Sequence, residues 1–499
     1  MRRTWMPIIG ALGAALLWAG AAGADGVSST VRVVNAHDAG PGSFRAAVAR
    51  ASADASVRRI EFRAGLQPIA LQAPVVFGGA QSLEIAGSGA RLDGSALPSD
   101  AAAALLVNGG GNLAISRIAV RNAPQHGLTY QVPGGASGVK RVTLTGVEVT
   151  GNDGHGVLVN DQVDPDDVAN DGGSAASLEV TVIGSQFTDN GFGALDRDGI
   201  RINEGGEGGL RLTMALSRAE HNGADGIELD ERGLGDATFS VASTLIVRNG
   251  SFDVTQADLD DGMDVDESGD GALVGTVVAS AANDNFEEGW DFNENHAGDF
   301  KVDLIGVEAS RNLEEGIDFE EDDDFQGGGD LITAIVGVKA DGNGPGGDAG
   351  LKIRERGDGN IDASVRLAQT AGNLTGGVNL REQGNGDLAA QIARVTATGN
   401  GTAGIAIRED DLGSLAATVE RSTTDGNTGH GVDCDENADG TLTATVRNGS
   451  SSTNGGAGVR ADQQAPGATG TLALTAMTLD GNTGGPYLAN AGVTVTQTP

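Results

Sequence analysis

The sequence predicts an all-β protein built as a single right-handed parallel β-helix, a solenoid with coils of about 27 residues and a short N-terminal capping helix. Three observations lead to this prediction. A six-residue unit recurs along most of the chain, the unit alternates apolar and polar residues, and no linker divides the chain into parts of different composition. One continuous stack of similar coils accounts for all three.

The recurring unit has the pattern Gly-apolar-X-apolar-X-Glu, where X is any residue. Consecutive copies begin 27, 36, 27, 27, 34, 27, 27, 27 and 27 residues apart. Apolar residues fill the second and fourth positions in every copy, and the residue between them is polar in nine of ten. This period of two is typical of a short strand with one buried face. The ten copies begin at Gly199, Gly226, Gly262, Gly289, Gly316, Gly350, Gly377, Gly404, Gly431 and Gly458, and two looser copies begin at Gly127 and Gly156.

Each coil also contains a second alternating apolar run and a third, weaker one that precedes an asparagine. Three short strands and three turns predict a triangular coil whose strands pair with the equivalent strands above and below it. No coil can bury its apolar face alone, so many coils must stack. A propeller, a leucine-rich repeat and a helical repeat fit less well, because their repeat lengths or periodicities differ.

Several repeat positions are expected to be structural. Asparagines four residues before the repeat glycine are expected to stack as a ladder inside a turn, because asparagine tolerates left-handed backbone and bonds to nearby main chain. The glutamate that ends each unit is expected to cap a turn. Trp290, Phe292 and Cys434 occupy inward positions and are expected to be buried, with Cys434 unreactive. The seven asparagines are Asn222, Asn285, Asn312, Asn373, Asn400, Asn427 and Asn454.

The first residues predict export. Arg2 and Arg3 precede an apolar stretch at 6–21 and the small residues Ala-Gly-Ala at 22–24, a pattern typical of a secretory signal peptide. We therefore expect a signal peptide at 1–24, an N-terminal cap with the first coils at 25–125, and the repeat region at 126–499, continuous with the cap. The expected location is outside the cytoplasm, in the extracellular space or the periplasm, without membrane insertion.

Composition limits the classes of partner. The formal net charge is −37, a sign that disfavours nucleic acid and anionic membranes and suits divalent cations or simple solubility. The chain has one cysteine, which excludes a disulfide framework. Aromatic residues make up only 3% of the chain, so platforms for stacking sugars are scarce.

The repeats resemble those of the pectate-lyase-like superfamily of right-handed parallel β-helix proteins. The opening of the chain is similar to that of many bacterial secreted β-helix repeat proteins, in DAGPGSFRAAV at 38–48, IEF at 60–62 and LEIAGSGARLDG at 83–94. The resemblance implies that 43–53 forms the capping helix. It implies little about activity, because the superfamily includes lyases, hydrolases, epimerases, adhesins and scaffolds.

The outward positions of the recurring strand carry the candidate site. Seven of the eight outward residues in four consecutive coils are carboxylates, and the following coils present basic residues instead. Equivalent residues of stacked coils lie about 4.7–4.9 Å apart, and two charges at that spacing repel by about 0.9 kcal/mol in water. Bound Ca²⁺ is one remedy and solvent screening is another. The expected Ca²⁺ ligands are Asp264, Asp266, Asp291, Asp318 and Glu320. Insertions at about 161–175, 191–198, 250–261, 322–328 and 344–349 are expected to wall this surface.

Two functions remain open. The first is a non-catalytic extracellular or cell-surface β-helix that binds glycan and Ca²⁺. The second is a Ca²⁺-dependent polysaccharide lyase or related enzyme acting on acidic polysaccharide, with Lys352 or Arg354 abstracting the proton beside a uronate. The catalytic motifs of a polygalacturonase-like hydrolase are incomplete in this chain. Only an Asp-Asp pair, Asp260-Asp261, and two Gly-His-Gly runs, around His155 and His430, are present. The first function is favoured, since the chain carries no complete lyase signature.

Overall fold

The computed structural model describes residues 29–162, 172–192, 197–250, 260–321, 328–344, 347, 349–464 and 467–499. The expected signal peptide and most residues of the expected loop walls lie outside these ranges. Within them, no helix is both long enough and apolar enough to cross a membrane.

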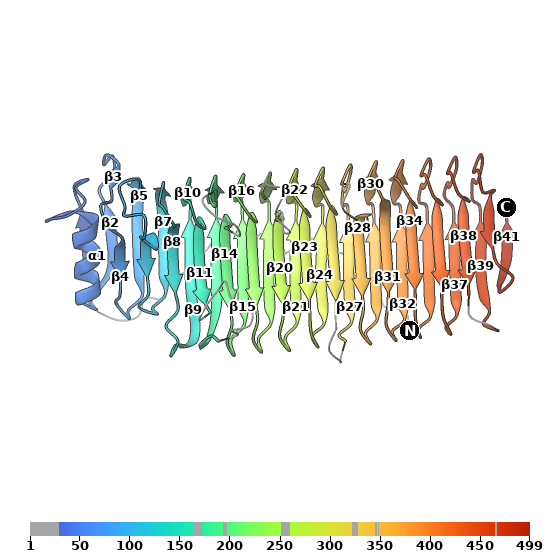
Figure 1. Ribbon diagram of the computed structural model, residues 1–499, viewed down its shortest axis with the longest axis horizontal. Coiled ribbons are helices and arrows are strands. Elements are labelled where there is room, and N and C mark those ends of the chain that lie inside the picture. Colours follow the sequence, from blue (N-terminus) through green and yellow to red (C-terminus); the bar gives the residue numbers. More distant parts are fainter. Residues whose placement is uncertain are drawn as a thin grey trace.

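The described chain winds into one elongated stack of coils, which follow one another in sequence order from α1 at one end to β41 at the other (Figure 1). Its strands belong to two long sheets and one small one, and every pairing between strands is parallel. In each repeat the strands join those of the next coil, so residues about 27 positions apart lie side by side. The predicted parallel β-helix is confirmed.

The recurring unit forms the 15-stranded sheet, and its strands follow in chain order. They are β4 (Val75–Phe77), β6 (Ala103–Val107), β8 (His126–Gln131), β11 (Val157–Asp161), β14 (Ile200–Glu204), β17 (Ile227–Glu231), β20 (Met263–Glu267), β23 (Trp290–Glu294), β26 (Ile317–Glu321), β28 (Ala349–Glu355), β31 (Gly376–Glu382), β34 (Ile405–Glu409), β36 (Val432–Glu436), β38 (Val459–Gln463) and β40 (Tyr487–Ala489). We call this the unit sheet.

The 24-stranded sheet combines the second and third strands of the coils. Its longer members are β1 (Ser29–Val33), β2 (Val57–Phe62), β5 (Leu83–Asp93), β7 (Leu113–Arg121), β9 (Ser137–Thr145), β12 (Ala175–Ile183), β15 (Leu210–Ala215), β18 (Ala237–Ala242), β21 (Leu273–Val278), β24 (Phe300–Ile305), β27 (Leu331–Val336), β29 (Ile361–Arg366), β32 (Leu388–Ala393), β35 (Leu415–Glu420), β37 (Leu442–Arg447), β39 (Gly470–Thr475) and β41 (Val493–Thr498). Its short members are β3 (Ile69–Ala70), β10 (Glu148–Thr150), β13 (Gln186–Thr188), β16 (Arg218–Glu220), β19 (Leu245–Val247), β22 (Ala281–Asn283) and β25 (Glu308–Ser310), while β30 (Gln369–Ala371) and β33 (Thr396–Thr398) pair separately.

The helix α1 (Phe44–Ala53) closes one end of the stack, as the sequence predicts. The side chain of Ser43 caps it by accepting a hydrogen bond from the backbone N–H of Ala46. Its buried face includes Phe44 and Val48, and Phe44 packs on Phe62 of β2 with ring centroids 4.9 Å apart. This helix covers apolar surface that the first coil would otherwise expose.

Inward side chains of successive coils form one continuous core. Trp290, Phe292 and Cys434 have no exposed surface, as expected, and burial raises the pKa of the Cys434 thiol well above its usual range. The rings of Phe292 and Phe319 lie 5.6 Å apart between neighbouring coils. A thiol held protonated in this core is unreactive.

The predicted asparagine ladder is present in a turn. Asn285 donates to Asn312 over 3.1 Å, and Asn312 donates in turn to Asn343 over 3.2 Å. The ladder also contains Asn249 and Asn343, which the fixed spacing did not identify because extra residues separate them from their repeat glycines. Its described members are Asn152, Asn190, Asn222, Asn249, Asn285, Asn312, Asn343, Asn373, Asn400, Asn427, Asn454 and Asn482.

This ladder explains why each unit begins with glycine. A Cβ atom on Gly316 would lie 2.6 Å from the side-chain nitrogen of Asn343 and 2.6 Å from the carbonyl oxygen of Gly350. Such contacts are far shorter than van der Waals separations. A side chain at this position would therefore push neighbouring coils apart.

The recurring glutamates cap turns, as predicted. Glu382 is typical, because its Oε1 accepts hydrogen bonds from the backbone N–H groups of Gly384 and Gly386, at 2.7 and 3.2 Å. Its other oxygen is solvent-inaccessible and has no hydrogen-bond partner in the described structure. We call the nine stacked residues the glutamate ladder: Glu204, Glu231, Glu267, Glu294, Glu321, Glu355, Glu382, Glu409 and Glu436, with Gln463 next in register.

Candidate functional site

The outward positions of the unit sheet form two columns along the stack. Strand register places Glu228, Asp264, Asp291, Asp318 and Lys352 in consecutive coils of the first column. The second column contains Asp230, Asp266, Asn293, Glu320 and Arg354. The structure therefore brings residues more than 100 positions apart onto one surface.

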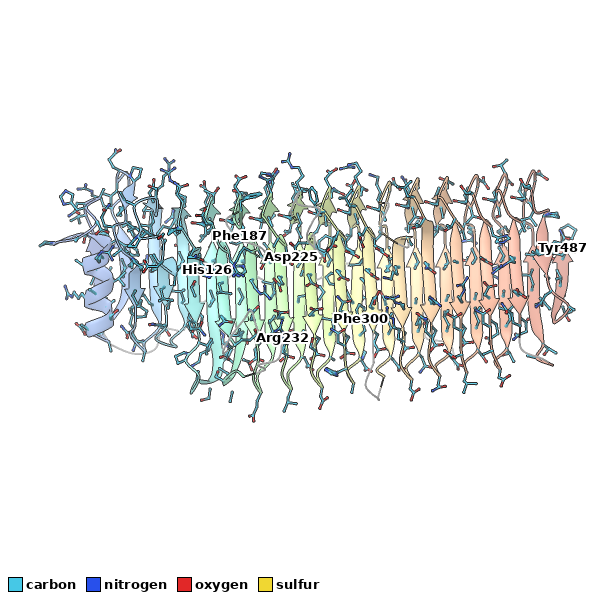
Figure 2. The ribbon with its side chains drawn as sticks, viewed as in Figure 1. His126, Phe187, Asp225, Arg232, Phe300 and Tyr487 are labelled. Atoms are coloured by element: carbon cyan, nitrogen blue, oxygen red, sulfur yellow. The ribbon has the colours of Figure 1, made fainter. Side chains whose placement is uncertain are left out.

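A third column of carboxylates runs along the edge of this surface, at the residue before each repeat glycine. The sequence analysis missed it, although this residue is acidic in five successive copies. Figure 2 shows Asp225 of this column and Arg232 at opposite ends of β17. The column contains Asp198, Asp225, Asp261, Glu288 and Glu315. We call the carboxylates of the three columns, from Asp198 to Glu320, the acidic face.

Backbone amides hold the third column in place. The N–H of Asp225 donates to Asp198 Oδ1 over 3.0 Å, and the N–H of Asp261 donates to Asp225 Oδ1 over 2.5 Å. The N–H of Glu288 continues the series to Asp261 Oδ1 over 2.6 Å. Asp198, Asp225 and Asp261 thus each bond to the next coil, which fixes their positions.

The two Gly-His-Gly runs lie in the same column. His155 Nδ1 accepts a hydrogen bond of 2.9 Å from the N–H of Asp198, and His430 Nδ1 accepts one of 2.9 Å from the N–H of Ala457. His126 stacks on His155 with ring centroids 4.9 Å apart. Both repeat histidines therefore link coils at the turn.

Carboxylate oxygens of the acidic face converge in small groups. Within each group one oxygen from every residue lies within 4.8 Å of the others. The sequence-predicted Asp264 and Asp291 come together with Asp261, and Asp318 comes together with Glu288 and Glu315. The two remaining groups are Asp198 with Asp225 and Glu228, and Asp261 with Glu287 and Glu288.

The other two predicted ligands have different surroundings. Glu320 contacts the cations Arg354, Arg356 and Lys352, and despite its burial these ion pairs hold its pKa at about 2. Asp266 belongs to none of the convergent groups of the described residues, and burial together with the charge of Asp230 raises its pKa to about 6.

Basic side chains lie at both ends of the acidic face. Lys352 Nζ lies 2.6 Å from Asp318 Oδ2, 2.5 Å from Glu320 Oε1 and 3.5 Å from Glu315 Oε1. At the other end Arg201 Nη2 lies 2.7 Å from Glu228 Oε1 and 2.9 Å from Asp230 Oδ2.

Between these ends the carboxyl groups are hard to ionise. Burial and the charges of Asp266 and Asp291 raise the pKa of Asp264 well above its usual range. Burial raises the pKa of Asp291 to about 7 and, with the charge of Asp291, that of Glu288 to about 10. Oxygens of Asp264, Asp291 and Asp318 are solvent-inaccessible and lack a hydrogen-bond partner among the described residues. Such atoms are costly unless a proton or a cation reaches them.

The two candidate catalytic bases are engaged in ion pairs. Burial lowers the pKa of Lys352, but the carboxylates Asp318, Glu315 and Glu320 raise it by more. The ammonium group therefore stays protonated. Arg354 contacts Glu320. A general base must first be neutral, and both side chains lie in surroundings that favour the charged form.

Comparisons with known proteins find no matching family model and no matching curated protein. Among solved structures the chain is similar to pectate lyase Pel9A, at 18% identity and a TM-score of 0.43, over 69% of this chain and 80% of that one. It is similar to the periplasmic alginate epimerase AlgG, at 12% identity and a TM-score of 0.35, over 88% and 76%. It is also similar to the A-module of mannuronan C-5 epimerase AlgE6 of Azotobacter vinelandii, at 12% identity and a TM-score of 0.30, over 93% and 99%.

All three TM-scores are below 0.5, so these likenesses concern the fold and leave the activity of this chain open. The protein's own strand register defines its class, which is a parallel β-helix protein.

Proposed function

We propose that the protein is an exported, non-catalytic β-helix that binds Ca²⁺ on its acidic face and, through the bound cation, an acidic polysaccharide. The observation that carries this proposal is the set of buried, unpartnered carboxylate oxygens on one surface. Asp264 Oδ1 and Asp291 Oδ1 are solvent-inaccessible, and neither oxygen has a hydrogen-bond partner among the described residues.

The geometry suits Ca²⁺ as the cation. Calcium binds six to eight oxygens at about 2.3–2.6 Å, so two ligands on opposite sides of the ion lie about 4.6–5.2 Å apart. The convergent carboxylates, with oxygens within 4.8 Å of one another, offer part of such a shell. Water and a carboxylate of the bound polysaccharide would supply the remaining oxygens.

The surface beyond Lys352 suits an anionic chain. The second outward column continues there with Arg381 and Arg408, whose side chains are 37% and 41% exposed. Guanidinium groups bind carboxylates through charge-assisted hydrogen bonds. The small side chain of Ala406 lies beside them in the first column. An acidic polysaccharide that spans both regions would meet bound Ca²⁺ and then arginine.

The lyase alternative needs Lys352 or Arg354 to accept a proton. Their ion pairs with Asp318 and Glu320 work against that role, and this is why we favour binding without catalysis. Both functions predict Ca²⁺-dependent recognition, and only the lyase predicts new double bonds in the polymer.

Affinity electrophoresis in gels containing pectate or alginate tests the proposal. We expect the protein to be retarded with millimolar Ca²⁺ and to migrate freely with a chelator, and a neutral dextran gel serves as control. Loss of retardation in Arg381→Ala and Arg408→Ala would support the basic region as part of the surface. Absence of retardation on every acidic polymer would contradict the glycan part of the proposal. Ultraviolet absorbance from unsaturated products would contradict the non-catalytic part.

A further inference from the structure

Nine asparagines of the chain are followed directly by glycine. In such a pair the glycine nitrogen can attack the side-chain amide carbon of the asparagine, because glycine has no Cβ atom to hinder the approach and its backbone rotates freely. The cyclic imide that forms reacts with water to give aspartate or isoaspartate. The nine are Asn108, Asn190, Asn222, Asn249, Asn343, Asn385, Asn400, Asn448 and Asn454.

Six of the nine belong to the asparagine ladder, which holds both reacting groups. In Asn400 the side-chain nitrogen donates to Asn427 Oδ1 and to the carbonyl oxygen of Thr370, each over 3.0 Å. The nitrogen of Gly401 donates to the carbonyl oxygen of Asn373 over 2.9 Å. Cyclisation would have to break these hydrogen bonds inside a packed turn. The glycine nitrogens after Asn190, Asn222, Asn249, Asn343 and Asn454 also donate to carbonyl oxygens.

Two pairs outside the ladder are held at the glycine nitrogen as well. The glycine after Asn385 donates to Glu382 Oε1 over 3.2 Å, and the glycine after Asn448 donates to Met477 Sδ over 3.3 Å. The attacking nitrogen is thus engaged in eight of the nine pairs.

The remaining pair, Asn108-Gly109, lacks these restraints. Asn108 is exposed and directly follows β6, at the start of a run of three glycines at 109–111. Its backbone N–H donates to the carbonyl oxygen of Phe77 over 3.0 Å, which anchors the asparagine at the edge of its coil. Neither the Gly109 nitrogen nor the Asn108 side chain has a hydrogen-bond partner among the described residues. The attacking nitrogen is therefore free, and the attacked amide is open to water.

We propose that Asn108 is a self-modification site, at which the chain converts asparagine to aspartate and isoaspartate without an enzyme. The Gly109 nitrogen bonds to Cγ of Asn108, the Cγ–Nδ2 bond breaks, and Nδ2 leaves as ammonia with the proton of Gly109. Water then breaks one of the two ring C–N bonds. Breaking the bond to Cγ gives aspartate, and breaking the bond to the main-chain carbonyl carbon gives isoaspartate. Either product adds one negative charge, and isoaspartate also lengthens the main chain between β6 and β7.

Storage of the folded full-length protein in mildly alkaline buffer, followed by peptide mass spectrometry, tests the proposal. Asn108 is expected to convert at least about tenfold faster than any of the other eight asparagines, equivalent to a barrier lower by about 1.4 kcal/mol. Storage in water enriched in heavy oxygen is expected to label the new carboxyl group. Asn108→Gln keeps the amide but requires a larger ring, and residue 108 is then expected to stay unmodified.

The same measurement on protein unfolded in guanidinium chloride is the control. All nine asparagines are expected to convert at comparable rates there, because the fold no longer holds the glycine nitrogens. Equal rates for Asn108 and Asn400 in the folded protein would overturn the proposal. A preference for Asn108 that persisted at the same size in the unfolded chain would also overturn it, since the local sequence and not the free nitrogen would then be the cause.

Discussion

The glutamate ladder predicts an unusual dependence of stability on pH. Ionised neighbours about 4.8 Å apart would repel by about 3.5 kcal/mol at an effective dielectric constant of 20. Since each inner residue has two ladder neighbours, full ionisation of the column is strongly unfavourable. We therefore expect protons to be shared along the column at neutral pH.

Glu382, an inner member of the ladder, is the residue for the test, because it lies two coils beyond Glu320, the last carboxylate of the acidic face. Burial, and then the neighbouring carboxyl group of Glu355, raises its pKa from 4.5 to about 10. A raised folded-state pKa gives stability that is fully present below pH 4.5 and is lost as the pH rises through 10. The protein is thus expected to tolerate acid and to lose stability progressively in alkali.

Two substitutions separate the capping role from the titration. Glu382→Gln keeps the oxygen that accepts from Gly384 and Gly386, and it cannot ionise. It is expected to gain at least about 1 kcal/mol relative to wild type between pH 6 and pH 10, since it relieves part of the repulsion. Glu382→Ala leaves the N–H groups of Gly384 and Gly386 without an acceptor and is expected to lose about 2–4 kcal/mol at every pH.

The assay is thermal unfolding at pH 5, 7 and 9, together with hydrogen exchange of the peptide that contains Gly384 and Gly386, because long repeat arrays do not always unfold in one step. Glu420→Gln changes a more exposed carboxylate outside the ladder and serves as control. If wild type and Glu382→Gln showed parallel pH dependence from 5 to 9, the reasoning about shared protons would be refuted.

Other predictions concern the turn ladder and the metal. Asn400→Ala is expected to cost about 2–4 kcal/mol, because it interrupts the buried hydrogen bonds along the ladder, and the exposed Asn360→Ala less than about 1 kcal/mol. Gly404→Ala is expected to cost more than about 2 kcal/mol, since the new Cβ would lie 2.6 Å from the amide of Asn427, whereas Gly134→Ala meets nothing within 4 Å and is expected to be neutral. Equal melting temperatures for the two asparagine variants, or for the two glycine variants, would contradict the packing described. Chelation of Ca²⁺ is expected to lower the melting temperature of wild type, and an unchanged temperature would contradict metal binding.

The sequence was sufficient for the architecture because every coil repeats the same constraints. The apolar positions fix the inward face of each strand, and the glycine and asparagine positions fix the turn. Asn249 and Asn343 were missed because insertions change their distance from the glycine, while the ladder itself continues through them. Spacing alone locates only coils without insertions.

The candidate site was predicted less completely. Alternation identified Asp264, Asp291 and Asp318, since they occupy outward strand positions. It gave no reason to include Asp261, which lies before β20 begins and so outside the period of two. The ion pairs of Lys352 also could not be predicted, because they depend on how a long side chain reaches back to the preceding coil.

The central claim is that the acidic face binds a divalent cation. Crystals grown with Mn²⁺, a hard cation with an anomalous X-ray signal, test it most directly. We expect an anomalous peak among the convergent carboxylates of the acidic face. A map without a peak there, or with peaks only at exposed carboxylates elsewhere, would contradict the claim.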